Sequence, residues 1–282
     1  MAVCGAMMVA MSALVEVPVA ERLLASAEDA TLVLDVRWSL AGADRAGYEQ
    51  GHVPGAVFCD LDRDLAGTPG AGGRHPLPDE AALLATFRRL GIAPGREVLV
   101  YDGGTGAAAA RAWWVLRWAG HEHVQVLDGG LAAWTAAGGD LEQGDVEPLA
   151  APDAVIRIGS MPTATADDVL AGRAGTLLDA RAAERYRGET EPIDPVAGHI
   201  PGAVSCPTSS LVRPDGRYLP PTELADLLSP DGATPLTAYC GSGVTAVQLV
   251  LAGHEAGFDL ALYPGSWSHW IQDPERPVAV GP

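Results

Sequence analysis

The stretch TLVLDVR (Thr31–Arg37) occurs a second time as TLLDAR (Thr176–Arg181), about 140 residues further along the chain. This period is far longer than the repeat unit of a solenoid, so each copy is predicted to be a whole domain. Three further blocks recur in the same order: GHVPGAV (Gly51–Val57) as GHIPGAV (Gly198–Val204), VLVYD (Val98–Asp102) as LTAYC (Leu236–Cys240), and Leu127–Trp134 as Tyr263–Trp270.

Within each copy, short apolar runs alternate with helix-like stretches. In the first copy the runs at 32–36, 97–101 and 124–127 are separated by stretches at 80–90 and 107–119. This alternation predicts an α/β fold of two tandem domains, each a mostly parallel sheet with helices on both faces and its own core. The expected division is a disordered apolar leader (1–15), a first domain (16–140), an acidic, proline-containing linker (141–158) and a second domain (159–282).

Composition excludes several classes of protein. The net charge of −18, with only 18 Lys plus Arg, lacks the basic stripe that nucleic-acid binding needs. The leader has no basic residue before Arg22 and is shorter than the roughly 18–20 apolar residues of a membrane span, so neither a secretory signal nor membrane attachment is expected. The four cysteines (Cys4, Cys59, Cys206, Cys240) show no zinc or disulfide spacing, which predicts no metal and a reducing, cytoplasmic location.

The second copy carries a candidate nucleophile in a loop of small residues. Cys240 ends an apolar run and is followed by Gly241, Ser242, Gly243, Val244 and Thr245, before a helix-like segment. Such a loop can curl tightly and aim backbone N–H groups at the sulfur, which favours the thiolate. Because ligand sites in parallel sheets lie beyond the carboxyl ends of strands, this position suits catalysis.

These motifs together resemble a two-domain rhodanese-type sulfurtransferase, from about residue 16 to residue 273. The Asp-x-Arg strand ends, the twin Gly-His-x-Pro-Gly-Ala loops, Arg185–Gly188 and Gly265–Trp267 all resemble that family, and the string Cys-Gly-Ser-Gly-Val-Thr resembles its 3-mercaptopyruvate sulfurtransferase branch. A dual-specificity phosphatase or an arsenate reductase is disfavoured, because those enzymes use an arginine six positions after the cysteine and residue 246 is Ala.

The resemblance implies an enzyme without a cofactor, in which Cys240 carries a sulfane sulfur as a persulfide from a small anionic donor to an acceptor. The acceptor is expected to be a thiol, cyanide or a thioredoxin-like protein. The donor favoured by the loop is 3-mercaptopyruvate, with thiosulfate as the alternative and a non-catalytic sulfur-relay module as the rival function. In the first copy Asp102 takes the place of Cys240, and a carboxylate cannot accept a sulfane sulfur, so catalysis is assigned to the second domain.

The same resemblance implies further site residues. Ser242, His75 and Asp62 match a serine-histidine-aspartate relay, with Asp60 as an alternative to Asp62. Arg185 matches the arginine that binds the donor carboxylate. Ile193 stands where a second such arginine is expected, and Arg187 and Arg213 are the candidates to replace it.

Two histidines of the shared motifs have expected structural roles, and one tryptophan has two possible roles. His52 and His199 occur in both copies, so they are predicted to bond to backbone and hold a loop. For Trp267 the sequence leaves two alternatives open, lining of the pocket or packing in the core.

Overall fold

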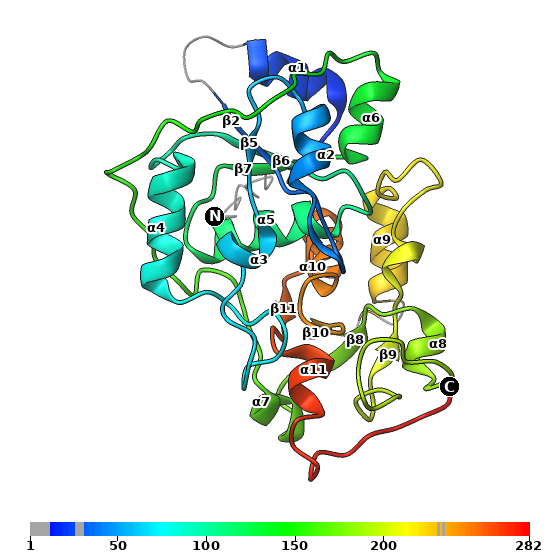
Figure 1. Ribbon diagram of the computed structural model, residues 1–282. Coiled ribbons are helices and arrows are strands. Elements are labelled where there is room, and N and C mark those ends of the chain that lie inside the picture. The colour runs from blue at the N-terminus through cyan, green and yellow to red at the C-terminus, as the bar shows by residue number, and fades with distance from the viewer. Residues whose placement is uncertain (1–11, 26–30, 230–231, 233–234) are drawn as a thin grey trace, which may run out of the picture.

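The computed structural model describes residues 12–25, 31–229, 232 and 235–282. The chain forms two α/β bodies, one above the other in Figure 1, and each is built on its own sheet. The strands of both main sheets pair in parallel, as the alternation of runs and helices predicts. The predicted fold class, two domains with parallel sheets flanked by helices, is therefore confirmed.

The first sheet has five strands in the order β1-β7-β6-β2-β5. Alternate side chains of β2 enter different cores, because successive residues of a strand point to opposite faces. Leu32 and Leu34 pack with α4 (Glu80–Leu90) and α5 (Ala107–Trp118), whereas Val33 packs with α1 (Val17–Ala25) and α6 (Gly130–Ala136) on the other face. A separate hairpin joins β3 and β4. The strands are β1 (Leu14–Val15), β2 (Leu32–Asp35), β3 (Trp38–Ser39), β4 (Gly42–Ala43), β5 (Val57–Phe58), β6 (Val98–Tyr101) and β7 (Val124–Leu127).

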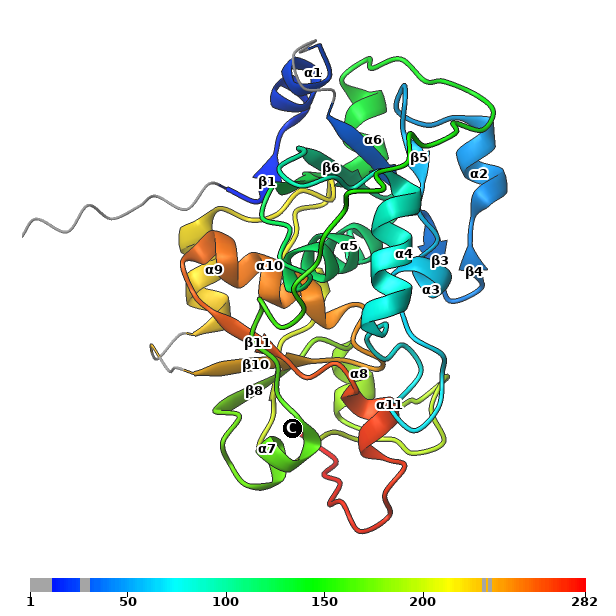
Figure 2. The ribbon, with the colours of Figure 1, turned by 90° about the vertical axis from the view of Figure 1, so that its left-hand side faces the viewer.

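The second sheet has four strands in the order β11-β10-β8-β9. Its two faces divide in the same way. Leu178 packs with α9 (Pro221–Leu228) and α10 (Ala246–Ala256), while Leu177 on the other face packs with α7 (Ala166–Leu170), α8 (Ala183–Tyr186) and α11 (Ser266–Trp270). Helices therefore cover both faces of each sheet (Figures 1 and 2). The strands are β8 (Thr176–Asp179), β9 (Val204–Ser205), β10 (Leu236–Tyr239) and β11 (Leu260–Leu262).

The predicted helical stretches at 80–90 and 107–119 of the first copy are α4 and α5. Those of the first body are α1 (Val17–Ala25), α2 (Arg45–Gln50), α3 (Leu61–Asp64), α4 (Glu80–Leu90), α5 (Ala107–Trp118) and α6 (Gly130–Ala136). Those of the second are α7 (Ala166–Leu170), α8 (Ala183–Tyr186), the 3₁₀ turn Thr208–Ser210, α9 (Pro221–Leu228), α10 (Ala246–Ala256) and α11 (Ser266–Trp270).

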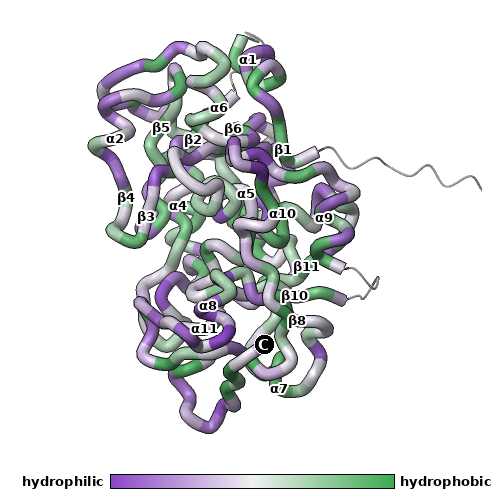
Figure 3. The backbone as a smooth tube through the Cα atoms, turned by 90° about the vertical axis from the view of Figure 1, so that its right-hand side faces the viewer, coloured by the Kyte–Doolittle hydropathy of each residue, from purple (hydrophilic) through white to green (hydrophobic). Residues whose placement is uncertain are grey.

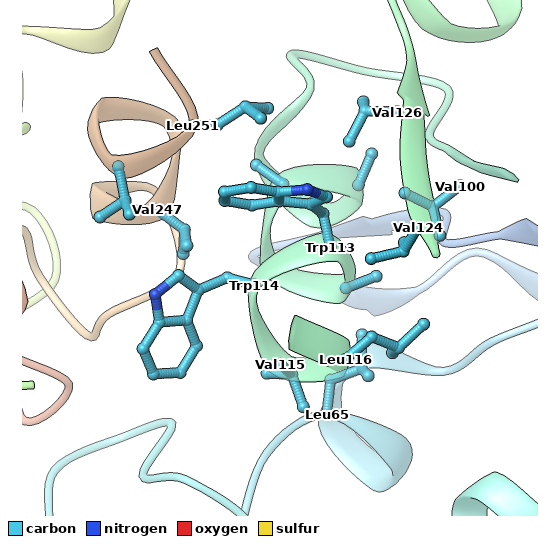
Figure 4. Packing of buried hydrophobic residues seen from close by; sticks show 14 of the residues in the cluster. Leu65, Val100, Trp113, Trp114, Val115, Leu116, Val124, Val126, Val247 and Leu251 are labelled. Carbon is cyan, nitrogen blue, oxygen red and sulfur yellow. The ribbon is translucent and has the colours of Figure 1, made fainter. Parts of the chain in front are cut away.

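Each body has a hydrophobic cluster of its own, as expected, but a further cluster is shared by both bodies. Helix α5 lies against α10 in the middle of the molecule, and a single cluster of buried side chains runs through both. Figure 4 shows Trp114 facing Val247, and Trp113 lying between Leu251 and the strand residues of β6 and β7. The apolar character of α10 is visible as a green helix at the centre of Figure 3. Because this contact is apolar and continuous, the bodies are held in a fixed relation.

Two segments outside the repeats dock onto the first body. The expected leader ends too late, because Leu14 and Val15 form β1, which extends the first sheet by pairing with Val126 and Leu127. Residues 1–11 of that leader lie outside the described residues. Residues 141–158 contain no helix and no ladder strand, and they run along the first body through backbone bonds such as that between Ala151 N–H and Arg88 C=O (2.8 Å).

Candidate active site

Cys240 lies directly after β10, where the chain turns toward α10 (Figure 1). Its backbone is fixed on both sides: its N–H donates to Ser266 Oγ (3.1 Å), and its carbonyl accepts from the Trp267 N–H (2.9 Å). The residue is only 1% exposed. The sulfur is therefore held at the carboxyl edge of the second sheet, where the parallel topology places ligand sites.

The loop after Cys240 curls back so that a backbone amide meets the sulfur. The Gly243 N–H lies 3.1 Å from Cys240 Sγ. Gly243 has φ +79°, and a Cβ there would lie 2.4 Å from the Pro264 carbonyl oxygen, so only glycine fits. Helix α10 begins at Ala246, and the Thr245 side chain does not cap its first N–H groups. A loop amide and an uncapped helix N-terminus both favour negative charge near the sulfur.

The structure brings Ser242, His75 and Asp62 together from both bodies. His75 lies in the loop between α3 and α4, with Nδ1 2.8 Å from Ser242 Oγ and Nε2 3.3 Å from Asp62 Oδ1. Because a carboxylate only accepts, the hydrogen of the neutral imidazole belongs on Nε2, which leaves Nδ1 to accept the Ser242 hydroxyl proton. Burial lowers the pKa of His75, although the Asp62 charge acts in the opposite direction, so the ring is neutral near pH 7.

The geometry distinguishes the two aspartates that the sequence left open. Asp60 is the N-cap of α3, and its Oδ1 accepts the N–H groups of Asp62 and Arg63. Asp62 faces His75 and also accepts the indole N–H of Trp38 (3.0 Å), whose ring meets the imidazole edge to face. Asp62 is thus the aspartate positioned to orient His75.

Arg185 reaches the loop of Cys240 from α8. Its Nε and Nη2 bind the two oxygens of Glu191 (3.1 and 2.6 Å), and Nη2 also lies 3.4 Å from Asp194 Oδ2. Burial opposes ionisation of Glu191, but the hydrogen bonds from Arg185 and from two backbone N–H groups outweigh it and lower the pKa of Glu191. The guanidinium is therefore fixed by charged partners, and both of its terminal nitrogens lie within 4 Å of a Cβ built on Gly241.

The expected replacements for a second arginine are not at this site. Arg187 pairs with Glu189 on the surface, and Arg213 borders a separate crevice near β1. Ile193 and Arg185 line the same cavity as Cys240. Arg74 lines it as well, although it was not predicted as a site residue. The signal for Arg74 was its place directly before His75 in the sequence.

A second arginine was also missed, because it lies inside the apolar helix α5. The Arg111 side chain is fully buried, and it donates to the carbonyls of Gly243 (3.0 Å), Leu65 (2.9 Å) and His75 (3.3 Å). None of its hydrogen bonds reaches a carboxylate in the described part of the chain. Burial lowers the pKa of Arg111 to about 10, and the Cys240 charge opposes that shift, so a cation remains near the sulfur at neutral pH. Arg111 therefore ties the active loop to the loop of His75.

Cys240, Ser242 and the two arginines Arg74 and Arg185 line a cavity of about 430 Å³ between the two bodies. His75 and Asp62 are not among its lining residues, so they lie behind Ser242. The walls of the cavity come from the Cys240 loop and from the equivalent loop of the first body, which face one another. The lining residues are Trp38, Ser39, Leu40, Arg74, Asp102, Gly104, Thr105, Ala107, Ala108, Arg185, Ile193, Cys240, Gly241, Ser242, Val244 and Thr245.

The shared motif residues hold the scaffold in both bodies. His52 Nδ1 lies 2.9 Å from the Tyr48 carbonyl, and His199 Nδ1 lies 2.8 Å from the Tyr186 carbonyl, each ring stacked on that tyrosine. The expected structural role of both histidines is confirmed. Trp267 is fully buried and is not among the lining residues, so of its two alternatives the structure supports core packing.

The rhodanese-like domain pattern matches residues 19–137 and residues 164–273 of this chain. The chain is 48% identical over 264 residues to SseB of Mycobacterium tuberculosis, which bears a provisional assignment as a thiosulfate sulfurtransferase; the match covers 90% of this chain and 93% of SseB. It is also 48% identical over 267 residues to a Pseudomonas aeruginosa protein provisionally assigned as a 3-mercaptopyruvate sulfurtransferase, covering 89% of this chain and 92% of that protein.

A solved structure agrees with these relatives. The crystal structure of SseA from Escherichia coli, described as a 3-mercaptopyruvate sulfotransferase of the rhodanese fold, matches with a TM-score of 0.79 and 32% identity. The match covers 91% of this chain and 99% of SseA. The chain therefore belongs to the rhodanese family and contains two rhodanese-like domains. The predicted class of enzyme, a sulfurtransferase, is confirmed by the relatives that share nearly its whole length.

Across the described residues, every helix is too short or too polar to cross a membrane.

Proposed function

We propose that this protein transfers a sulfane sulfur from 3-mercaptopyruvate to a thiol or cyanide through a persulfide on Cys240. The observation that carries the proposal is the arrangement around one sulfur atom. The Gly243 N–H meets Cys240 Sγ at 3.1 Å, and Ser242, two residues after the cysteine, forms a chain with His75 and Asp62. The first feature suits a thiolate, and the second suits movement of a proton beside it.

In the first half-reaction the Cys240 thiolate attacks the donor sulfur. The new S–S bond forms as the bond between sulfur and C3 of the donor breaks, and the electron pair stays with C3 as pyruvate enolate. The proton released from the donor thiol ends on that carbon, which gives pyruvate. We assign the carriage of this proton to the Ser242 hydroxyl, because His75 Nδ1 can accept its proton and return it.

In the second half-reaction an acceptor thiolate attacks the outer sulfur of the persulfide. The S–S bond breaks, the sulfur leaves as the acceptor persulfide, and Cys240 returns to its thiolate. Cyanide would take the same sulfur and leave as thiocyanate. A thioredoxin-like protein is the proposed macromolecular acceptor, because it presents a low-pKa thiolate. Each turnover is then ping-pong, and the sulfur rides on the cysteine alone.

The choice of donor rests on the charges that face Cys240. Glu191 holds the Arg185 guanidinium in place, and Arg185 can bind the carboxylate of the donor. The enolate that leaves must be protonated, and the relay of Ser242 and His75 can deliver that proton. Thiosulfate needs no such proton, because sulfite leaves as a stable anion. Thiosulfate is nevertheless the named substrate class of SseB, so it is the second candidate donor.

A reducing compartment such as the cytoplasm suits this chemistry. Cys59, Cys206 and Cys240 are all free thiols, and Cys240 must remain unpaired to act as a nucleophile. Small-molecule donors and thiol acceptors are the proposed partners, and neither nucleic acid nor membrane is among them.

The test compares kcat/KM for 3-mercaptopyruvate and for thiosulfate on one preparation, with cyanide as the common acceptor. The proposal expects the larger value for 3-mercaptopyruvate, and it expects Ser242→Ala to reduce that value more than the value for thiosulfate. A larger value for thiosulfate, unaffected by Ser242→Ala, would contradict the proposed donor and the role of the relay.

A further inference from the structure

Arg74 reaches the active loop from the other body. It lies in the loop between α3 and α4, which Figures 1 and 2 show descending in cyan to the red helix α11. Its backbone N–H donates to Ser268 Oγ (3.1 Å). Gln272 Nε2 donates to the Gly70 carbonyl of the same loop (3.0 Å). The loop is therefore fastened to the second body at two points, and the position of Arg74 is fixed relative to Cys240.

The guanidinium of Arg74 lies beside that of Arg185, next to the nucleophile. A Cβ built on Gly241 would lie 2.9 Å from Nη2 of Arg74, and 3.7 and 3.8 Å from Nη2 and Nη1 of Arg185. Both side chains line the cavity that holds Cys240. Two arginines from two bodies thus converge on the residue after the cysteine, and a side chain larger than that of glycine would crowd Arg74.

One carboxylate holds both guanidinium groups in place. Asp194 Oδ1 pairs with Arg74 Nη1, and its Oδ2 lies 3.4 Å from Arg185 Nη2. The Asp194 side chain is only 3% exposed. Within the described residues, Arg74 Nη2 and Arg185 Nη1 form no hydrogen bond, so each arginine is anchored by one edge and presents another N–H group to the cavity. This arrangement leaves donors for a ligand anion after the protein's own carboxylates are satisfied.

We infer that Arg74 is a specificity-determining residue that binds the donor carboxylate together with Arg185. The inference rests on the proposed function and identifies the second cation of that site, at the position where Ile193 supplies none. A carboxylate has two oxygens, and two guanidinium groups approaching from different directions can bind both. Asp194 is then a positioning residue, because it sets the distance between the two cations.

The test uses two alkylating probes of the same shape. 3-Bromopyruvate and bromoacetone both react as Cys240 displaces bromide, with an S–C bond formed and a C–Br bond broken, but only the first carries a carboxylate. In Arg74→Gln the second-order rate constant for 3-bromopyruvate should fall about tenfold or more, while that for bromoacetone should stay within about twofold. Arg74→Lys should lie between, because it keeps the charge and loses the fork.

Arg187→Gln is the matched control, since Arg187 is a surface arginine of the same body as Arg185 and is paired with Glu189. It should leave both rate constants unchanged. An unchanged 3-bromopyruvate rate in Arg74→Gln would overturn the inference, and so would an equal fall for both probes, which would indicate a disturbed loop. Alkylation does not require sulfur transfer, so the proposed function can fail in the wild type while the inference about Arg74 still stands, and the reverse also holds.

Discussion

The loop after β6 and the loop after β10 occupy equivalent places in two copies of one module, and in each a backbone N–H group meets the side chain that follows the strand. In the first body that side chain is a carboxylate. Asp102 Oδ1 accepts the N–H groups of Gly104 (2.9 Å) and Gly106 (3.1 Å), and its Oδ2 accepts those of Ala108 and Ala109 (both 3.1 Å). The amides at the start of α5 are thus satisfied by a carboxylate, which is a common stabilising arrangement at a helix N-terminus.

In the second body a cysteine replaces that carboxylate, and the loop amides are not all taken up by it. One N–H, that of Gly243, meets Cys240 Sγ, and the Thr245 side chain at the N-cap of α10 does not cap the helix. The comparison indicates that the fold of the module favours negative charge at the position that Asp102 and Cys240 share. In the first copy this preference stabilises the fold, and in the second it would favour the charged sulfur that the proposed mechanism requires.

A second difference concerns Gly130 and its counterpart Ser266, which lie next to Asp102 and Cys240 respectively. Gly130 has φ +55°, and its counterpart Ser266 has φ +54°, the one positive φ of a non-glycine residue in the described part of the chain. A left-handed serine costs roughly 1 kcal/mol or more of backbone strain. Its Oγ accepts the Cys240 N–H (3.1 Å), so the strained residue is also one that fixes the position of Cys240.

The largest effect expected from this comparison is the loss of the nucleophile. Cys240→Ser should reduce kcat by about 10⁴-fold or more without changing the free energy of unfolding by much, because the loop backbone is held by Ser266 and Trp267. Cys240→Asp should be equally inactive and fold as stably as the wild type, because it recreates the first loop. Steady-state assays and urea unfolding would measure both.

Cys206→Ala is the control for that experiment. Burial raises the pKa of Cys206 to about 11, so this thiol stays protonated at neutral pH and takes no part. Appreciable activity in Cys240→Ser, or inactivity in the well-folded Cys206 variant, would contradict the assignment of the nucleophile.

A smaller effect is expected from Asp62→Asn. Asp62 and His75 lie in the first body and Ser242 lies in the second, so the relay joins the two bodies that are compared. Removal of the carboxylate removes a cause that raises the pKa of His75, so that pKa, already below 6.5 through burial, should fall further. kcat should drop about 10- to 100-fold. NMR titration of the His75 ring proton would follow the pKa, and Asp60→Asn is the control because Asp60 only caps α3.

The lowered pKa of His75 also determines how the stability of the fold changes with pH. His75 binds a proton less readily in the folded than in the unfolded chain, so its contribution to stability is present above pH 6.5 and declines as the pH falls through the folded value. A His75 pKa that rises in Asp62→Asn, or a loss of kcat in Asp60→Asn equal to that in Asp62→Asn, would remove Asp62 from the relay.

The smallest effect on activity is expected from Asp102→Asn, which changes the first loop only. An amide offers one oxygen where the carboxylate offers two, and its NH₂ group would face backbone donors, so the free energy of unfolding should fall by about 2 kcal/mol. Sulfur transfer should continue. Unchanged stability in urea would show that the first loop does not need an anion. That result would contradict the conclusion that the module favours negative charge at this position.

The duplicated motifs were sufficient to predict the parallel sheets, the two copies and the position of Cys240, because regular elements follow the periodicity of apolar residues. The resemblance also named the residues that meet across the cleft, Ser242 and His75, and the structure places them 2.8 Å apart. Their separation in sequence carries no such information by itself. The choice between Asp60 and Asp62 required coordinates, because a cap and a relay member differ only in where a side chain points.

Three features escaped prediction for physical reasons. Strand β1 is two residues long, too short for a period to be recognised. Arg111 stands in an apolar helix, where an arginine side chain can equally reach the surface, and only the packing of α5 against α10 buries it. Arg74 lies in an irregular loop whose path is set by contacts with the other body, including the bond to Ser268, and no local pattern encodes such contacts.

The mass of the intact protein after brief exposure to 3-mercaptopyruvate, without acceptor, tests the account most directly. A persulfide on Cys240 predicts a gain of one sulfur atom that maps to the peptide containing Cys240, is absent in Cys240→Ser and disappears on addition of cyanide. A wild-type protein that turns over donor with no added sulfur on that residue would contradict it.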